Sequence, residues 1–346
     1  MTNSEPLIRA ISILVDTRWI GAHGIGRFAH EVTNRLQNVI SLPCSLAPYP
    51  FHRLDIPWIS WLLLRYRPSV YFSPGFNPPI WSPVPFVFTI HDLIFLHFPE
   101  EASSLMQPYF NWVVKSAARR AYRVLTVSEF SKREIVKWAN LPEEKVVVVS
   151  NGVGAEFTPD GSRHDPGYPY LLYVGNRCPH KNLARMLLAF SLVKMTETRL
   201  VLSGNPDREI MSQIEDLNLA DRVVFTGFIP DAELPGYYRG AIGSIFVSLY
   251  EGFGLPPLEA MACGIPVLTS NVSSLPEVVG DAAILVNPLD VDEIARGMEQ
   301  IINDRNLRAD LSLRGIEQAK KFSRDRTAQL TQAILDDARS MKYVKS

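Results

Sequence analysis

The chain alternates short apolar runs with longer segments in which apolar residues recur every three or four positions. The apolar runs are rich in β-branched and aromatic residues and show little polar alternation, which is typical of strands buried on both faces of a parallel sheet. Helical patterns lie between them, for example at residues 26–38, 103–120 and 128–139. We therefore expect an α/β protein. The expected strands are residues 10–15, 69–73, 86–91, 123–127 and 145–149 in the first half, and 170–174, 199–203, 222–225, 243–248, 265–269 and 282–286 in the second.

A stretch rich in Gly, Pro and Asp interrupts this alternation at residues 154–169 and has no periodicity. The chain has 346 residues, more than the roughly 250–300 residues at which a single core stops growing. We interpret the stretch as an interdomain linker. The expected domains are 1–158 and 159–324, followed by a helix at 325–346.

Composition excludes some classes of protein. The formal net charge of -1 argues against a nucleic-acid partner. The three cysteines, Cys44, Cys178 and Cys263, have neither metal-ligand spacing nor the number that a disulfide framework needs. No apolar core of a signal peptide follows the N-terminus, and no run of 18 apolar residues is present. We therefore expect a cytoplasmic protein.

One apolar segment has two interpretations. Residues 56–68, IPWISWLLLRYRP, contain two tryptophans and end with two arginines. Such a segment is either a core helix that leads into the next strand or an amphipathic surface that contacts a membrane.

The loop after the first expected strand is rich in glycine and contains Gly24 and Gly26. Glycines between a strand and a helix allow backbone N–H groups to approach a phosphate or a sugar, although a plain tight turn has the same composition. The loop is not a GxGxxG fingerprint, because Ala29 stands where a third glycine would fall, and residues 38–46 contain no acidic residue. A nicotinamide-dependent dehydrogenase is therefore disfavoured.

Two other expected strands end in polar residues. His91 and Asp92 follow the strand at 86–91, and ligands of open α/β sheets gather at such ends. Arg177, His180 and Lys181 follow the strand at 170–174 and precede a helix. Cations at a helix N-terminus oppose the helix dipole unless an anion is bound there, so this segment indicates a diphosphate site, the alternative being a solvated turn.

The most specific segment is EGFGLPPLEAMACGIPV, in which Glu251 and Glu259 bracket a loop rich in Gly and Pro. The prolines are compatible with the first turn of a helix. A loop glutamate can accept hydrogen bonds from sugar hydroxyls, a helical one can hold a ribose, and the loop amides can face a phosphate.

This segment resembles the E-x7-E signature of glycosyltransferase family 4, the retaining enzymes of the GT-B fold. GIGR at 24–27, HD at 91–92, VSEFSKREI at 127–135, SNGV at 150–153 and YVGNRCPHKN at 173–182 resemble other segments of that family, in the same order. One position departs from it, since Asn176 stands where many members have arginine. The resemblance implies two Rossmann-like domains whose parallel sheets face each other across a deep cleft, and a C-terminal helix that returns to the first domain.

The resemblance also implies roles for individual residues. Glu251 would bind donor-sugar hydroxyls and Glu259 the ribose, while Phe253, Gly254 and Leu255 would place amides near the sugar and phosphates. Lys181 would contact the diphosphate, with Arg177 as an auxiliary cation. His91 would lie beside the donor sugar, with Gly24 and Gly26 over the diphosphate or acceptor. His91, Glu251 and Lys181 are thus the expected catalytic residues, and the first domain would bind the acceptor.

The implied reaction moves a hexose from a nucleotide sugar to a glycan or lipid-linked saccharide in polysaccharide or O-antigen assembly. The GIGR and HD segments look most like bacterial mannosyltransferases, which favours GDP-mannose or a related GDP-hexose. We expect no cofactor and no metal, because Asp290-Val-Asp292 follows Asn-Pro and is typical of helix capping. Alternatives are a UDP-sugar donor, an epimerase or phosphorylase of the same fold, and an inactive sugar-nucleotide-binding partner. The basic aromatic segment leaves open a peripheral contact with the inner face of the cytoplasmic membrane.

Overall fold

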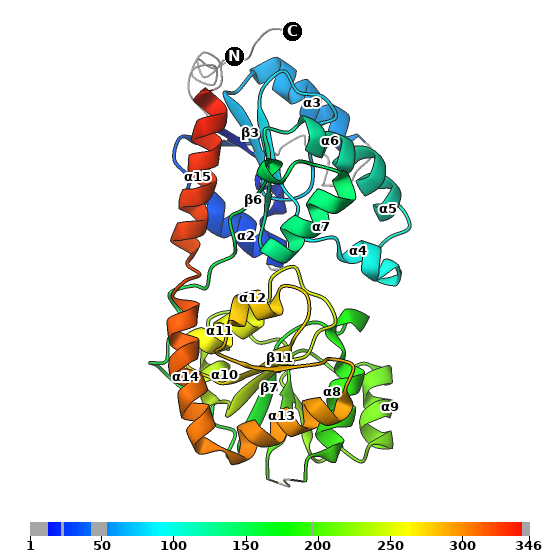
Figure 1. The fold of residues 1–346 in the computed structure, drawn as a ribbon, viewed down its shortest axis with the longest axis vertical. Coiled ribbons are helices and arrows are strands. Elements are labelled where there is room, and N and C mark those ends of the chain that lie inside the picture. Colours follow the sequence, from blue (N-terminus) through cyan, green and yellow to red (C-terminus); the bar gives the residue numbers. More distant parts are fainter. Residues whose placement is uncertain (1–12, 22–23, 43–53, 195–196, 341–346) are drawn as a thin grey trace. The chain divides into compact units, whose positions relative to one another are not determined.

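The computed structural model describes residues 13–21, 24–42, 54–194 and 197–340. The chain forms two compact units, Met1–Gly152 together with Arg324–Ser346, and Val153–Ser323. Each unit contains one six-stranded sheet in which every strand pair is parallel, with helices packed against it (Figure 1). The expected α/β class with two parallel sheets is therefore confirmed.

The sheet of the first unit has the strand order β2-β1-β3-β4-β5-β6. Its strands are β1 (Ile13–Val15), β2 (Val39–Ser41), β3 (Val70–Ser73), β4 (Phe86–Thr89), β5 (Arg123–Thr126) and β6 (Val146–Val148). Its helices are α2 (Gly24–Thr33), α3 (Asp55–Tyr66), α4 (Ile94–His97), α5 (Met106–Tyr109), a π-helical turn (Phe110–Val114), α6 (Lys115–Arg120), α7 (Glu129–Ala139) and α15 (Arg324–Ser340). Short 3₁₀ turns lie at Thr17–Trp19, Pro99–Glu101 and Glu143–Lys145.

The last helix belongs to the first unit. α15 packs against α2 and β3 (Figure 1). Asp325 accepts a hydrogen bond from Arg35 at 2.8 Å, and Arg324 lies 3.0 Å from Glu31. The expected return of the C-terminal helix to the first unit is confirmed.

Helix α3 has a buried face and an exposed face. Ile59, Leu62 and Leu63 are buried in the core of the first unit, whereas Trp61 and Leu64 are 57% and 46% exposed. One face of the segment therefore packs in the core, as the first interpretation predicts, and the other face is apolar and accessible, while the membrane contact stays a prediction.

The sheet of the second unit has the order β12-β11-β10-β7-β8-β9. Its strands are β7 (Tyr170–Tyr173), β8 (Arg199–Leu202), β9 (Val223–Phe225), β10 (Gly243–Phe246), β11 (Val267–Ser270) and β12 (Ile284–Val286). Its helices are a 3₁₀ turn (Pro179–Lys181), α8 (Leu183–Leu192), α9 (Arg208–Asp216), α10 (Leu234–Gly240), α11 (Leu255–Ala262), α12 (Leu275–Val279), α13 (Val291–Asn303) and α14 (Arg305–Ala319). α8 packs against α9 and α13, while α11 packs against α10 and α14, and Figure 1 shows these two groups on either side of the sheet.

The boundary between the units lies at 152/153, six residues before the expected 158/159. Two contacts explain the difference. Val153 forms a bridge with Ser323, and the Phe157 ring meets the Tyr238 ring edge-on at 6.1 Å, so the start of the expected linker packs on the second unit. Among the described residues, no helix combines the length and hydropathy needed to cross a membrane.

Candidate active site

The sheet of the second unit has a topological switch point beside β7. The chain continues from β7 to its neighbour β8 and then to β9, whereas β10 lies on the other side of β7. Parallel sheets bind ligands outside the carboxyl ends of the strands at such a point, because the loops leave in opposite directions and open a crevice. The segments that leave β7 and β10 contain Lys181 and Glu251.

The structure brings these two residues together. Lys181 Nζ lies 2.6 Å from Glu251 Oε1, and the two side chains are 14% and 13% exposed. Lys181 ends a 3₁₀ turn, after which Asn182 has a φ of 63°. The Asn182 amide donates to the carbonyls of Val247 at 3.0 Å and Pro288 at 2.7 Å, so this turn is fixed against the segment that follows β10.

Two serines after β11 fix the loop that contains Glu251. Ser274 Oγ lies 2.9 Å from the Glu251 carbonyl and 2.8 Å from the Phe253 carbonyl, and can donate to either. The backbone N–H of Glu251 donates to Ser273 Oγ at 3.1 Å. Neither serine was predicted from the sequence, although their place just after a strand was a signal available there.

The glycine and the aromatic residue of this loop have local structural roles. Gly254 has a φ of 110°, and a Cβ there would lie 2.7 Å from the Leu275 side chain, so no other residue fits without a shift. The Phe253 ring is buried and meets the Phe322 ring edge-on at 5.7 Å. Only the backbone of Phe253 is therefore suited to a ligand. Leu255 is the first residue of α11, so its N–H and that of Gly254 lie at the helix N-terminus, whereas Pro256 and Pro257 have no N–H to donate.

The second glutamate of the signature accepts a hydrogen bond from a neighbouring helix. Glu259 lies on α11 and is 3% exposed. The hydroxyl of the buried Tyr238 on α10 donates to Glu259 Oε2 at 3.0 Å. Tyr238 was not predicted from the sequence either, because it lies 21 residues before Glu259 and on a separate helix.

Arg177 and Lys181 have different partners. The Arg177 guanidinium lies 3.9 Å from Asp207 and 5.5 Å from the centre of the Phe225 ring, so it faces residues of β9 and of the segment after β8. The Asn176 side chain accepts a hydrogen bond from the Cys178 N–H at 3.3 Å and supports the turn. Asp290 caps α13 by accepting from the Glu293 N–H at 2.9 Å, as its sequence context predicts.

In the first unit the glycine loop enters α2, which begins at Gly24. A Cβ on Gly26 would overlap the backbone of Gly21, which accounts for glycine at that position. At Gly24 no atom of the described residues lies within 4 Å of such a Cβ, and its φ is outside the left-handed region. Glycine at 24 is therefore not required by the described surroundings, and its small size is consistent with a ligand that approaches the helix N-terminus.

His91 lies just beyond β4 and contacts both α2 and the segment after β3. Its ring meets the Phe28 ring of α2 edge-on at 4.9 Å. Its Nε2 lies 3.0 Å from the Pro74 carbonyl, and because a carbonyl only accepts, Nε2–H is the donor. Asp92 accepts from the Ile94 N–H at 3.1 Å, which is a structural role at the start of α4.

Comparisons with known proteins agree with this geometry. Residues 15–157 match the model of "Glycosyltransferase Family 4", and residues 155–318 match that of "Glycosyl transferases group 1". The "O-antigen chain mannosyltransferase B" of Escherichia coli is 35% identical over 280 residues, which cover 76% of this chain and 73% of that protein.

Two other similarities differ in extent and identity. The "Serotype-specific mannosyltransferase WbdA" of Escherichia coli is 32% identical over 231 residues, which are 61% of this chain and 28% of WbdA. The crystal structure of Anabaena Alr3699/HepE in complex with UDP and glucose superposes with a TM-score of 0.75 over 95% of this chain and all of that one, at 18% identity. The chain therefore belongs to glycosyltransferase family 4 and is a glycosyltransferase of the GT-B fold.

Proposed function

We propose that this enzyme is a retaining mannosyltransferase. It transfers mannose from GDP-mannose, or a closely related hexose from a GDP-sugar, to a glycan or lipid-linked saccharide in O-antigen assembly. The observation that supports this most directly is the Lys181–Glu251 pair at the switch point of the second unit. The 35% identity with an O-antigen chain mannosyltransferase supports the choice of sugar and acceptor.

The second unit supplies the donor site in this proposal. Glu251 accepts hydrogen bonds from sugar hydroxyls, Glu259 holds the ribose while Tyr238 fixes its carboxylate, and the amides at Phe253, Gly254 and Leu255 face the sugar and phosphates. As the nucleoside diphosphate leaves, negative charge develops on its phosphate. Lys181 and the backbone N–H groups of Gly254 and Leu255, at the N-terminus of α11, stabilise that charge.

The first unit supplies the acceptor site. Gly24 and Gly26 face the diphosphate or the acceptor, and His91 lies beside the donor sugar. The acceptor hydroxyl attacks from the face that the leaving group vacates, which gives retention. The reaction uses neither a metal ion nor a cofactor.

The test begins with the donor. A thermal-shift series with GDP, UDP, ADP and CDP should show the largest stabilisation with GDP, since ligand at about 100 times its dissociation constant adds about 2.7 kcal/mol to the free energy of unfolding. The donor sugar is then identified by product formation from GDP-mannose with a mannose-containing oligosaccharide acceptor, and the anomeric proton of the product by NMR gives the stereochemistry.

Each alternative has its own outcome. A larger stabilisation by UDP than by GDP would show that the donor is a UDP-sugar. A product of inverted configuration would show that the mechanism is inverting. Nucleotide binding with neither transfer nor donor hydrolysis identifies an inactive binding partner.

We also propose that the enzyme contacts an anionic membrane surface through the exposed face of α3, on the cytoplasmic side. Leu54, Trp61 and Leu64 are each at least 46% exposed and share one side of the helix by their spacing. Trp81, 53% exposed, is close to α3, because its backbone N–H donates to Ser60 at 3.2 Å. Arg65 and Arg67 at the end of the helix add positive charge.

Vesicle sedimentation tests this contact. The protein should sediment with vesicles that contain 30 mol% phosphatidylglycerol, which is about one anionic lipid in three. Less of the protein should sediment with vesicles of pure phosphatidylcholine. The Trp61→Ser and Leu64→Ser double variant should lose retention, while Leu313→Ser, which replaces an exposed leucine of the second unit, should not. Equal retention of the double variant excludes this face as the membrane contact.

A further inference from the structure

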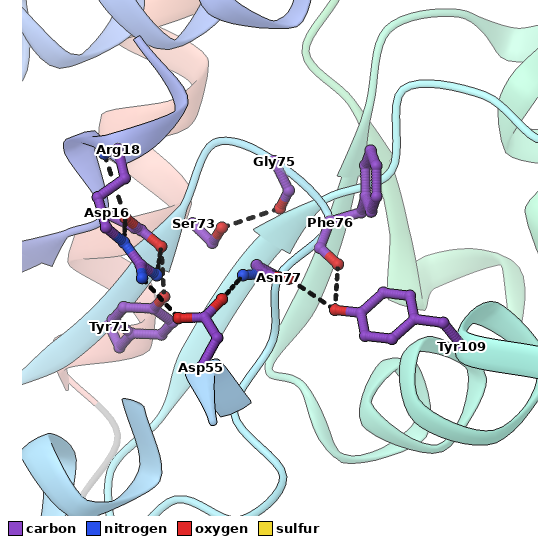
Figure 2. Close-up of polar contacts among 9 residues, drawn as sticks. All are labelled: Asp16, Arg18, Asp55, Tyr71, Ser73, Gly75, Phe76, Asn77 and Tyr109. Atoms are coloured by element: carbon purple, nitrogen blue, oxygen red, sulfur yellow. Dashed lines mark hydrogen bonds and ion pairs between the residues drawn. The ribbon is translucent and has the colours of Figure 1, made fainter. Parts of the chain in front are cut away.

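The sheet of the first unit has its own topological switch point, and a buried polar cluster fills it. β1 lies between β2 and β3, so the segments that leave β1 and β3 diverge there. Figure 2 shows the side chains at this point, and five of them form a continuous hydrogen-bonded chain that we call the Arg18 cluster: Asp16, Arg18, Asp55, Asn77 and Tyr109.

Arg18 is the centre of this cluster. Its Nε and Nη2 donate to the two carboxylate oxygens of Asp16 at 2.7 and 2.6 Å, and its Nη1 donates to Asp55 at 2.5 Å. The guanidinium also lies 5.3 Å from the centre of the Trp58 ring. The planar fork of arginine thus ties the turn after β1 to the first residue of α3.

The cluster continues to the segment after β3. Asp55 accepts a hydrogen bond from the Asn77 amide, whose oxygen accepts from the Tyr109 hydroxyl at 2.7 Å. The acceptor-only carboxylate fixes which way the Asn77 amide points. Gly75 in the same segment lies so close to the Trp19 ring that a Cβ there would overlap it. Both ends of the segment 74–77 are therefore held.

This segment also holds the imidazole of His91. Pro74, which accepts from His91 Nε2 at 3.0 Å, is three residues before Asn77. Arg18 is thus connected to the His91 ring through Asp55, Asn77 and the three peptide units between Asn77 and Pro74.

The cluster is costly to bury, which argues that it has a function besides stability. Asp16, Asp55 and Asn77 are completely buried, and two carboxylates share one guanidinium. Burial raises the pKa of Asp55, and the pKa of the Tyr71 hydroxyl beside Asp16 is raised well above its usual value, again mainly by burial. Apolar side chains of similar volume often stabilise a core as well as a buried ion pair or better, so the polar cluster provides specific geometry.

We propose that Arg18 is a positioning residue for His91. Through Asp55 and Asn77 it fixes the segment 74–77, and that segment fixes the tautomer and orientation of the imidazole. This inference rests on the proposed function for the role of His91 in transfer, but the placement of the ring can be measured without activity.

The test compares Arg18→Lys, which keeps the charge and loses the fork, with Arg35→Lys. Arg35 is a matched control because it also pairs with two acids in the first unit, Glu31 at 2.5 Å and Asp325 at 2.8 Å, but on the partly exposed face of α2 and α15. Tyr109→Phe is a milder second variant that removes one hydroxyl from the end of the cluster and keeps the test open if Arg18→Lys does not fold.

The first readout is the ¹⁵N and ¹H NMR spectrum of the imidazoles, with the His91 signals assigned by their absence in His91→Gln. Arg18→Lys and Tyr109→Phe should shift or broaden the His91 signals, and Arg35→Lys should leave them unchanged. Unchanged His91 signals in both folded cluster variants overturn the proposal, whatever the enzyme turns out to transfer.

The second readout is kinetic. The turnover of Arg18→Lys should fall by about tenfold or more, the scale of a misplaced group at a reacting centre, while the dissociation constant for the nucleotide stays within about twofold because the nucleotide binds to the second unit. If the melting temperature falls while turnover per folded enzyme is unchanged, the cluster is only structural. If no variant or wild type transfers sugar, the proposed function fails while the NMR result still decides the positioning.

Discussion

The Lys181 ammonium and the Glu251 carboxylate are 2.6 Å apart, although 70 residues separate them in the sequence. Lys181 follows β7 and Glu251 follows β10, and these strands are neighbours in the sheet. In a donor site, one group neutralises the leaving diphosphate and another binds the sugar hydroxyls. The distance between these two groups cannot exceed the length of one sugar diphosphate. Their contact therefore supports one donor site formed by both residues.

Replacement of Glu251 by alanine should lower kcat/KM by at least ~100-fold, on the order of 2.7 kcal/mol of transition-state stabilisation. The reason is that the carboxylate would contact the sugar, so its loss removes hydrogen bonds to hydroxyls near the reacting centre and leaves Lys181 without its partner. Steady-state kinetics with one donor and one acceptor measure the effect, and circular dichroism checks the fold.

Glu209→Ala is the matched control for this experiment, since Glu209 is an exposed acid on α9 of the same unit. Its kcat/KM should equal that of the wild type. Near-normal turnover in Glu251→Ala would mean that the ion pair only braces the loop after β10.

Much of the fold could be predicted because buried parallel strands have an unmistakable composition. All eleven expected strands are present, and eight of them are fully or mostly buried runs such as Val70–Ser73 and Tyr170–Tyr173. β2 was missed because its three residues, Val39–Ser41, are only partly buried and lie at the sheet edge, so they show no apolar run. The helix expected over 103–120 is interrupted, since a π-helical turn at Phe110–Val114 follows Pro108.

The site was predicted in part for a related reason. Lys181 and Glu251, which the structure places in contact, were predicted because each belongs to a local motif, and His91 was predicted for the same reason. Tyr238, Ser273 and Ser274 belong to no motif and act only through residues that the fold brings to them. The same is true of the Arg18 cluster, whose members Arg18 and Asp55 are 37 residues apart.

Removal of divalent metal should leave activity intact. The Asp-x-Asp pair at 290–292 begins α13, where Asp290 caps the helix through the Glu293 N–H, and this accounts for the motif without a metal. Transfer should therefore proceed at the same rate in excess EDTA as in its absence. A loss of activity that Mn²⁺ or Mg²⁺ restores would contradict the metal-independent mechanism.

Stability should fall at alkaline pH, and Cys263 should contribute to the fall. Burial raises the pKa of the Cys263 thiol from 9.0 to about 12, so above pH 9 the unfolded chain releases a proton that the folded chain keeps. The contribution is fully present below pH 9 and is lost as the pH rises from 9 to 12. At about pH 10.5 the thiol should account for about 2 kcal/mol of lost stability.

Urea unfolding of the wild type and of Cys263→Ala at pH 8 and pH 10.5 measures this contribution. Buried tyrosines such as Tyr173, whose pKa burial raises, contribute equally to both proteins and cancel in the comparison. The free energy of unfolding should decrease less in the variant than in the wild type. An equal decrease in the two proteins would show that the Cys263 thiol has the same pKa in the folded and the unfolded chain.

The last prediction ranks the two cations after β7. Lys181 contacts Glu251, whereas Arg177 faces Asp207 at 3.9 Å and the Phe225 ring at 5.5 Å. We therefore expect Lys181 to be the principal cation for the diphosphate and Arg177 an auxiliary one. Lys181→Ala should lose at least ~2 kcal/mol of transition-state stabilisation, the scale of one preorganised charge or donor, and Arg177→Ala should lose less.

The comparison uses kcat/KM with one donor and one acceptor, with Lys194→Ala, an exposed lysine of the same unit, as the control. Asn176→Arg should be tolerated, because the bond that the Asn176 side chain makes with its own turn is weak, accepting from the Cys178 N–H at 3.3 Å. An inactive Arg177→Ala beside a near-normal Lys181→Ala would reverse the ranking. If both variants keep normal kcat/KM, the segment after β7 does not bind the diphosphate, and the leaving group depends on the N–H groups of Gly254 and Leu255 alone.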